Sequence, residues 1–83
     1  MNILYFAWLR QRTGTGHESI VLPDGVATVG ELVDWLKARG PGYAKAFEEP
    51  KVVRAAVNQE YVPFDHPVSD GDEVAFFPPV TGG

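Results

Sequence analysis

The chain has 83 residues, of which 45% are hydrophobic and none is cysteine, and its formal net charge is −4. A chain of this length forms one small domain, and its apolar content is typical of folded rather than disordered chains. The lack of cysteine excludes disulfides and thiolate metal sites and fits a reducing compartment. The acidic balance argues against nucleic acid as a partner, because phosphates would repel it.

The sequence shows no membrane or export signal. No run approaches the roughly 18 consecutive apolar residues of a membrane span. The N-terminal stretch NILYFAW has neither a basic lead-in nor a small-residue cleavage pattern, so we interpret it as structure rather than as a signal peptide. We therefore expect a cytoplasmic protein with no membrane partner.

The first segment of the chain predicts a hairpin with a long loop. Residues 2–8 are mostly apolar and alternate, which indicates a strand. Residues 9–16, LRQRTGTG, carry turn residues, and residues 17–22, HESIVL, predict a second strand that Pro23-Asp24-Gly25 stops.

A long helix is predicted over residues 28–40, TVGELVDWLKARG. Thr28 and Glu31 have the spacing of a capping box, in which each side chain satisfies a free N–H of the first turn. Gly40 can take the left-handed conformation that ends many helices. A single buried stripe follows at helical spacing: Val29, Leu32, Val33 and Leu36.

The second half of the chain predicts shorter elements. Residues 41–50 connect the long helix to the next strand and include one helical turn that pairs Tyr43 with Phe47. Strands are expected over 52–57, near Tyr61 and Val62, and over 73–77. Between them SDGDE predicts a tight turn in which Gly71 supplies a positive φ.

This order of elements predicts an α+β fold. One main helix can cover only one face of a mixed sheet, which is the β-grasp, or ubiquitin-like, arrangement. The last strand would then lie in the middle of the sheet beside the first. We expect a β-grasp domain over residues 1–77 and a flexible C-terminal tail over residues 78–83 that projects from it.

Alternation along the strands predicts an apolar face that the helix does not cover. A contiguous patch of large apolar side chains usually marks a binding surface. A covering loop, or a reversed assignment of the two faces, is the alternative. The residues predicted on this face are Leu4, Phe6, Trp8, Ala75 and Phe77.

The residues offer no catalytic or metal-binding constellation. His17 and His66 have no further ligands at metal-site spacing. Asp70, Asp72 and Glu73 resemble a cation loop, but a hairpin turn explains them with fewer assumptions. We therefore expect no bound metal or cofactor.

The ending PPVTGG is the most informative stretch. Prolines favour an extended backbone, and at about 3.3 Å per residue six residues reach roughly 20 Å. Gly82 and Gly83 lack Cβ atoms, so they can enter a slot too narrow for other residues. The reactive group would be the carboxylate of Gly83, activated by another protein as an acyl-adenylate. The segment that guides it is Pro78, Pro79, Val80, Thr81 and Gly82.

Three consecutive stretches, AAVNQEYVPFDHPVSDG, DGDEVAFF and PPVTGG, resemble the small subunit of molybdopterin synthase, the MoaD-type sulfur carriers of the ubiquitin-like superfamily. The resemblance covers nearly the whole chain. It implies that Gly83 is adenylated with ATP by a ubiquitin-activating-like adenylyltransferase and converted to a thiocarboxylate by a sulfur donor protein. The tail would then deliver sulfur to cyclic pyranopterin monophosphate (precursor Z) during molybdenum cofactor biosynthesis.

The resemblance also implies partners. The catalytic pocket would belong to the large synthase subunit, with two small and two large subunits in a heterotetramer, so this chain alone would not be an enzyme. Phe6, Arg10, Tyr61 and Phe77 match positions where the family contacts its partners.

Three alternatives remain open at this point. The chain could be a ubiquitin-like modifier that forms an isopeptide with a target lysine. It could carry sulfur for another pathway, such as thiamine synthesis or tRNA thiolation. It could also be an interaction module in which the two glycines are incidental.

Overall fold

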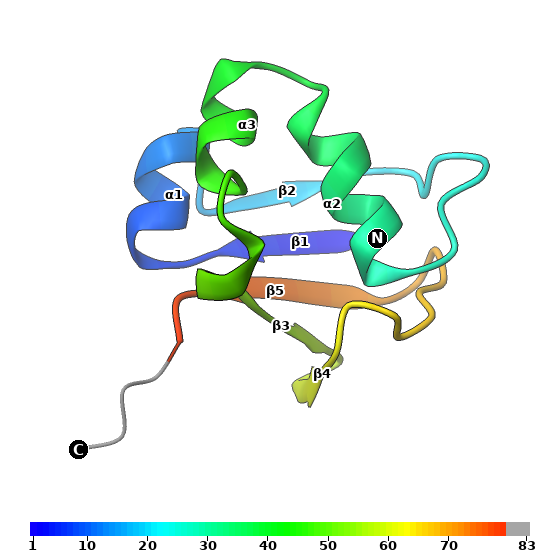
Figure 1. Ribbon diagram of the computed structural model, residues 1–83. Helices are drawn as coiled ribbons and strands as arrows, with labels where there is room; N and C mark the ends of the chain where they lie inside the picture. Colours follow the sequence, from blue (N-terminus) through cyan, green and yellow to red (C-terminus); the bar gives the residue numbers. More distant parts are fainter. Residues whose placement is uncertain (80–83) are drawn as a thin grey trace.

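The computed structural model describes residues 1–79, which form a five-stranded mixed sheet with the helices on one face (Figure 1). The strand order is β2-β1-β5-β3-β4. The elements are β1 (Asn2–Tyr5), α1 (Ala7–Thr13), β2 (His17–Ser19), α2 (Val29–Lys37), α3 (Pro41–Ala46), the 3₁₀ turn η1 (Pro50–Val52), β3 (Arg54–Val57), β4 (Glu60–Val62) and β5 (Glu73–Phe77).

The predicted placement of the last strand is confirmed. β5 lies between β1 and β3, parallel to β1 and antiparallel to β3. Asn2 pairs with Glu73 and Tyr5 with Phe76, so the two parallel strands finish at the same end of the sheet. The segment after Phe77 therefore leaves the sheet at the end where α1 begins (Figure 1).

Helix α2 forms as its capping box predicts, but it ends differently. The Glu31 N–H donates to Thr28 Oγ1 over 3.2 Å, and the Ala27 N–H donates to Glu31 Oε1 over 3.0 Å. Gly40 has a φ of 166°, which is extended rather than left-handed, because it serves as the N-cap residue of α3. All four residues of the predicted stripe are buried: Val29, Leu32, Val33 and Leu36.

The prediction of a long first strand and loop is wrong, because residues 7–13 form helix α1. Strand β1 ends at Tyr5, Leu9 is fully buried, and Gly14 (φ 82°) ends the helix with its N–H on the Arg10 carbonyl. Ala7 begins the helix at a φ of 53°, a left-handed conformation that is unusual for a residue with a Cβ. Residues 3–9 are all apolar, so their pattern fits the period of a strand and that of a helix equally and does not decide between the two.

Other boundaries and turns also differ. The second strand stops at Ser19, and the third begins at Arg54 after η1. The positive-φ glycines of the described residues are Gly14 and Gly25, so the positive φ expected at Gly71 is wrong. The Asp72 side chain holds that turn instead, because it accepts the Ser69 N–H over 2.8 Å.

The hydrophobic core lies between the inner face of the sheet and the three helices. Three helices, rather than the single main helix expected, cover this face (Figure 1). Within residues 1–79, none of these helices has the length and apolar character needed to span a bilayer. The largest fully buried side chains are Tyr5, Phe47, Phe76, Ile3, Leu9, Leu32, Leu36, Val29, Val53 and Val74.

Helices α1 and α3 approach so closely that Gly42 has no room for a side chain. A Cβ built on Gly42 would lie 2.4 Å from the Arg12 carbonyl oxygen, closer than real Cβ contacts come. A backbone atom cannot rotate away as a flexible side chain can, so α3 would have to shift as a whole.

We expect Gly42→Ala to lower the free energy of unfolding by about 2 kcal/mol, since overpacking costs about 1–3 kcal/mol. Alanine normally stabilises a helix interior relative to glycine by about 1 kcal/mol, so the sign of the change is diagnostic. The control is Gly40→Ala, because Gly40 has an extended backbone and no heavy atom within 4 Å of its Cβ position. Urea unfolding of the two variants measures the difference, and equal midpoints would contradict the close packing.

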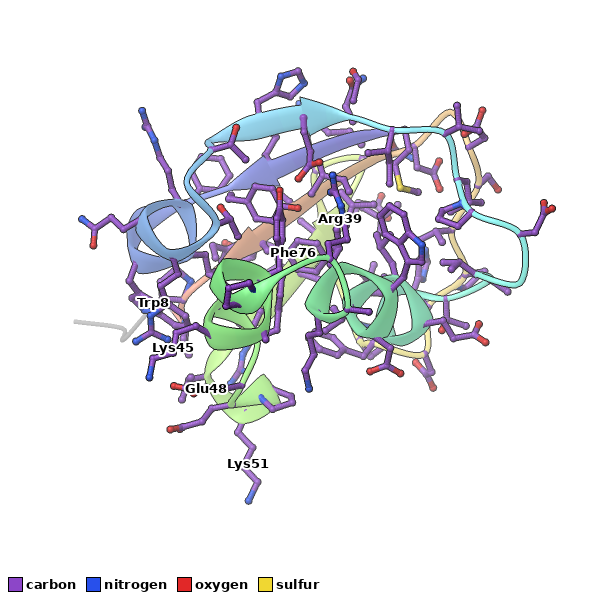
Figure 2. All side chains as sticks on the ribbon, turned by 90° about the horizontal axis from the view of Figure 1, so that it is seen from above. Trp8, Arg39, Lys45, Glu48, Lys51 and Phe76 are labelled. Carbon is purple, nitrogen blue, oxygen red and sulfur yellow. The ribbon has the colours of Figure 1, made fainter. Side chains whose placement is uncertain are left out.

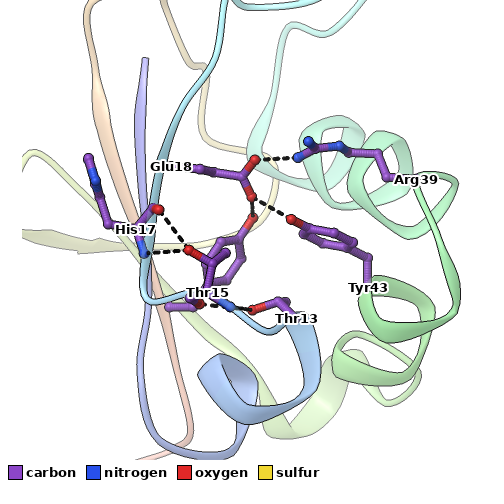
Figure 3. A network of polar contacts seen from close by, with 7 residues as sticks. Thr13, Thr15, His17, Glu18, Arg39 and Tyr43 are labelled. Carbon is purple, nitrogen blue, oxygen red and sulfur yellow. Dashed lines mark hydrogen bonds and ion pairs between the residues drawn. The ribbon is translucent and has the colours of Figure 1, made fainter.

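A polar cluster ties β2 to the helical layer across the edge of the sheet (Figure 3). Glu18 accepts hydrogen bonds from Tyr5 Oη at 2.8 Å and from Tyr43 Oη at 2.9 Å, and it forms an ion pair with Arg39. Burial by itself would raise the pKa of the Glu18 carboxyl, but the hydrogen bonds from Arg39, Tyr5 and Tyr43 outweigh it and lower the pKa below its ordinary value. Burial and the Glu18 hydrogen bond raise the pKa of Tyr5, which keeps its hydroxyl protonated as a donor.

The lowered pKa makes Glu18 a source of pH-dependent stability. The pKa of the Glu18 carboxyl is lower in the folded state than its value of 4.5 in the unfolded state. The stability that the carboxylate contributes is therefore fully present above pH 4.5 and is lost as the pH falls through the folded pKa. We expect Glu18→Gln to cost about 1–2 kcal/mol at neutral pH and to flatten the fall of stability below pH 4.5. The control is Glu49→Gln, at an exposed position. Thermal melts between neutral and acidic pH measure both, and identical pH profiles for the two variants would contradict this role.

Candidate functional site

The face of the sheet opposite the helices carries the predicted apolar side chains. Ile3 and Tyr5 point into the core, and so do Val74 and Phe76, which confirms the predicted assignment of faces on β1 and β5. No helix of the described residues lies on the opposite face (Figure 1). One row of side chains crosses it in register: Leu4, Ala75, Ala56 and Tyr61.

Three aromatic residues dominate this uncovered face. Tyr61 is 75% exposed and Phe6 is 48% exposed, while Phe77 is half-buried. The Tyr61 and Phe77 rings lie 5.2 Å apart between centroids, so they form one continuous apolar surface that spans β3 from β4 to β5. Large aromatic groups left in water on one face of a sheet favour burial against a partner. We call the set of Leu4, Phe6, Tyr61, Ala75 and Phe77 the uncovered face.

Trp8 was expected on this face and is not there. It lies on α1, partly buried against the core, with the Arg12 guanidinium 4.5 Å above its ring. The correction follows from the early end of β1, because a helix does not continue the strand alternation. Ala7, which alternation placed with the buried residues, is exposed for the same reason.

Trp8 instead lines a groove where the chain leaves the sheet. Pro79 forms part of the groove wall, so the groove borders the start of the predicted tail. Pro78 and Pro79 are half-buried and follow β5 directly. Sequence reasoning missed this groove, since its residues come from distant segments: Trp8, Arg12, Glu48, Glu49, Val52 and Pro79.

The remaining tail residues, Val80, Thr81, Gly82 and Gly83, lie outside the described residues. The roles predicted for them, including the carboxylate chemistry of Gly83, stay predictions.

Arg10 does not join the uncovered face. It is exposed on α1, and its side chain lies over Gly16, where a Cβ would be 3.1 Å from Arg10 Nε. The structure therefore gathers three of the four predicted partner contacts, Phe6, Tyr61 and Phe77, and places the fourth on the helical side.

The described residues provide an exposed apolar surface that can bind a partner. They contain no group of three His, Cys, Asp or Glu side chains placed to hold a metal ion. His17 Nε2 lies 3.3 Å from Asn2 Oδ1 at the exposed sheet edge, and Asp72 is engaged in its turn. An apolar face beside the start of the tail can hold a partner while the tail reaches into it.

Comparison with known proteins finds similarity over the full length of the chain. Residues 3–83 match the ThiS family. The molybdopterin synthase sulfur carrier subunit of Escherichia coli strain K12 is 46% identical over 83 residues, which is 100% of this chain and 99% of that protein. The protein of the same name from Haemophilus influenzae is 41% identical over the same share of each chain. The crystal structure of small archaeal modifier protein 1 from Haloferax volcanii is 30% identical, with a TM-score of 0.74 over 96% of this chain and 97% of its own.

Proposed function

The chain belongs to the ThiS family, and from this premise we propose that it is the sulfur-carrier subunit of a molybdopterin synthase. The observation that carries the proposal is the full-length similarity to relatives of that name, which includes the PPVTGG segment. The uncovered face beside Pro78 and Pro79 supports it, because a carrier subunit needs a docking surface next to its tail.

The proposed chemistry takes place at the carboxylate of Gly83. A carboxylate oxygen attacks the α-phosphate of ATP and releases pyrophosphate, which leaves an acyl-adenylate. The terminal sulfur of a persulfide on the donor protein then displaces AMP and gives an acyl disulfide. A second thiol of the donor attacks the donor's own sulfur in that bond, which leaves a thiocarboxylate on Gly83 and a disulfide on the donor. The thiocarboxylate sulfur attacks the pterin precursor, displaces an oxygen substituent and leaves the carrier joined to the pterin as a thioester. Water hydrolyses this thioester, which returns the Gly83 carboxylate and leaves the sulfur on the pterin, and two such deliveries form the dithiolene.

Under this proposal the domain contributes binding and position. The large synthase subunit docks on the uncovered face and receives the tail, and it supplies the acid–base groups. The activating adenylyltransferase and the sulfur donor are further partners, and the reactions take place in the cytoplasm. Two copies of each subunit form the proposed heterotetramer.

Intact-mass measurement of the chain purified from its native host tests the proposal. We expect a fraction in which one terminal oxygen is replaced by sulfur, in cells that are making the cofactor. Treatment with alkylating reagent should add one label at the terminus, because the domain has no cysteine to compete. A chain that stays unmodified under these conditions would overturn the proposal.

A second function is favoured by the similarity to small archaeal modifier protein 1. In that case Gly83 forms an isopeptide bond with lysines of other proteins, and larger conjugates appear in the same cells. The same purification separates the two functions, since conjugates and a thiocarboxylated free chain differ in mass. A thiocarboxylate without conjugates favours the carrier.

A further inference from the structure

The charges of the molecule are divided between its two ends. Arg10 and Arg12 lie on α1, Lys45 on α3, and Lys51 and Arg54 at the start of the η1–β3 segment. This end carries two side-chain carboxylates, Glu48 and Glu49, so its side chains have a formal charge of +3. The side chains of the rest of the chain include two cations and nine carboxylates, a formal charge of −7, and the two together give the side-chain total of −4.

The topology places these five cations at the end of the sheet where the chain leaves it. Arg54 pairs in register with Phe77, the last residue of β5. Arg12 donates a hydrogen bond to the Lys45 carbonyl over 3.2 Å, and it lines the groove with Pro79. Lys45 extends from α3 near Trp8 and Glu48, and Lys51 extends from η1 farther from Trp8 (Figure 2). We call Arg10, Arg12, Lys45, Lys51 and Arg54 the basic collar.

The members of the basic collar are available for long-range interaction. All five are exposed. The pairs Lys45–Glu48 at 3.5 Å and Arg12–Glu48 at 4.0 Å are exposed as well, so they neutralise little. The acidic turns lie at the opposite end of the sheet, because β5 begins there and β3 ends there. The chain is therefore an electric dipole whose positive end surrounds the base of the tail.

We propose that the basic collar steers the tail toward an acidic surface around the opening of the adenylating enzyme. This inference rests on the proposed function. A carrier that is reloaded after each delivery must meet its activating enzyme again in every cycle, so a faster encounter shortens one step of each cycle. Complementary charge acts on that rate, and can raise it by about 10–10³-fold.

A protein partner fits the collar better than a small anion. The four residues from Val80 to Gly83 span at most about 13 Å when extended. When the tail is extended, an ATP phosphate beside the Gly83 carboxylate would lie well away from the collar, whereas a protein that surrounds the tail would contact it. The negative end of the dipole would at the same time be repelled by an acidic protein surface, which disfavours an approach with the tail pointing away from the enzyme.

The test measures kcat/KM for adenylation of the carrier, by pyrophosphate release, as a function of salt. We expect the double variant Lys45→Gln with Lys51→Gln to lower kcat/KM about 10-fold at low salt and to leave kcat unchanged. The reason is that the rate of association between carrier and enzyme enters KM but not kcat. The loss should vanish near about 1 M salt, where the screening length is about 3 Å.

The matched control makes the same change in net charge at the other end. Val21→Glu with Gln59→Glu adds two negative charges at exposed positions near the acidic end. We expect this pair to leave kcat/KM within about 2-fold of the original value. Equal effects of the two pairs, or a kcat/KM that salt does not change, would overturn steering by the collar.

The assay also separates this inference from the proposed function. If the unaltered chain is never adenylated, the proposed function fails. If it is adenylated and the collar pair behaves like the unaltered chain, only the steering fails. A loss at low salt that ATP concentration, rather than carrier concentration, restores would assign the collar to the nucleotide and contradict a protein surface.

Discussion

Deletion of Gly83 is expected to abolish sulfur transfer while the domain stays folded. The buried core of the described chain ends at Phe76, so removal of the last residue takes no contact from it. The deletion moves the terminal carboxylate back by about 3.3 Å. A misplacement of about 1 Å can cost 10²-fold in rate, so we expect a loss of at least that size in both adenylation and transfer.

A second deletion separates reach from the identity of the last residues. Removal of Thr81 leaves the terminal Gly-Gly intact but shortens the tail by the same amount. If reach decides, both deletions lose activity to the same extent. If activity depends instead on two terminal glycines that fit a narrow slot, only the deletion of Gly83 loses activity. Pyrophosphate release and intact mass measure activity, and thermal melting measures folding.

Either result constrains the proposal. Activity that survives both deletions would mean that the terminal carboxylate is not the reacting group. A melting midpoint that falls with activity would mean that the tail stabilises the domain, and the loss could then no longer be assigned to chemistry.

Local signals were sufficient to predict helix α2. The capping box of Thr28 and Glu31 and the buried stripe of four apolar residues act within single turns, so sequence reveals them directly. The same holds for the alternation that assigned Phe76 to the core and Phe77 to the uncovered face, because side chains on a strand alternate whatever lies above them.

Helix α1 could not be predicted because its cause is not local. Residues 3–9 are apolar throughout, which suits a strand and a helix alike. The chain turns into a helix at Ala7, at a φ of 53° that its own sequence does not favour. Burial of Leu9 and the close approach of Gly42 to α1 compensate for this conformation, and both depend on segments far along the chain.

Some residues of the candidate site could likewise be predicted from local sequence, and others could not. The aromatic residues of the uncovered face could be predicted, since Phe6 and Phe77 follow from alternation. The basic collar could not, because Arg12, Lys45 and Arg54 are distant in sequence and meet only through the parallel pairing of β1 with β5 and the packing of α3 on α1. Gly83 was assigned by resemblance and lies outside the described residues.

Phe77→Asp is expected to weaken binding to the large subunit by at least about 100-fold, which is about 2.7 kcal/mol. Phe77 lies on the uncovered face against Tyr61, directly before Pro78. An aspartate there would remove an aromatic anchor and bury a charge without a partner in the interface, and each effect alone costs on the order of 2 kcal/mol. Folding should lose less than about 1 kcal/mol, because the ring points away from the core and lies against the exposed ring of Tyr61.

Val21→Asp provides the control for this prediction. Val21 is 82% exposed and lies beyond β2, at the opposite end of the sheet from the tail, so it introduces the same charge outside the uncovered face. Calorimetric titration with the large subunit compares the two variants, and thermal melting checks their folding. Similar affinities for the two would place the interface elsewhere. A Phe77→Asp variant that melts early but binds normally would instead assign Phe77 to the core, and the uncovered face would lose its proposed role.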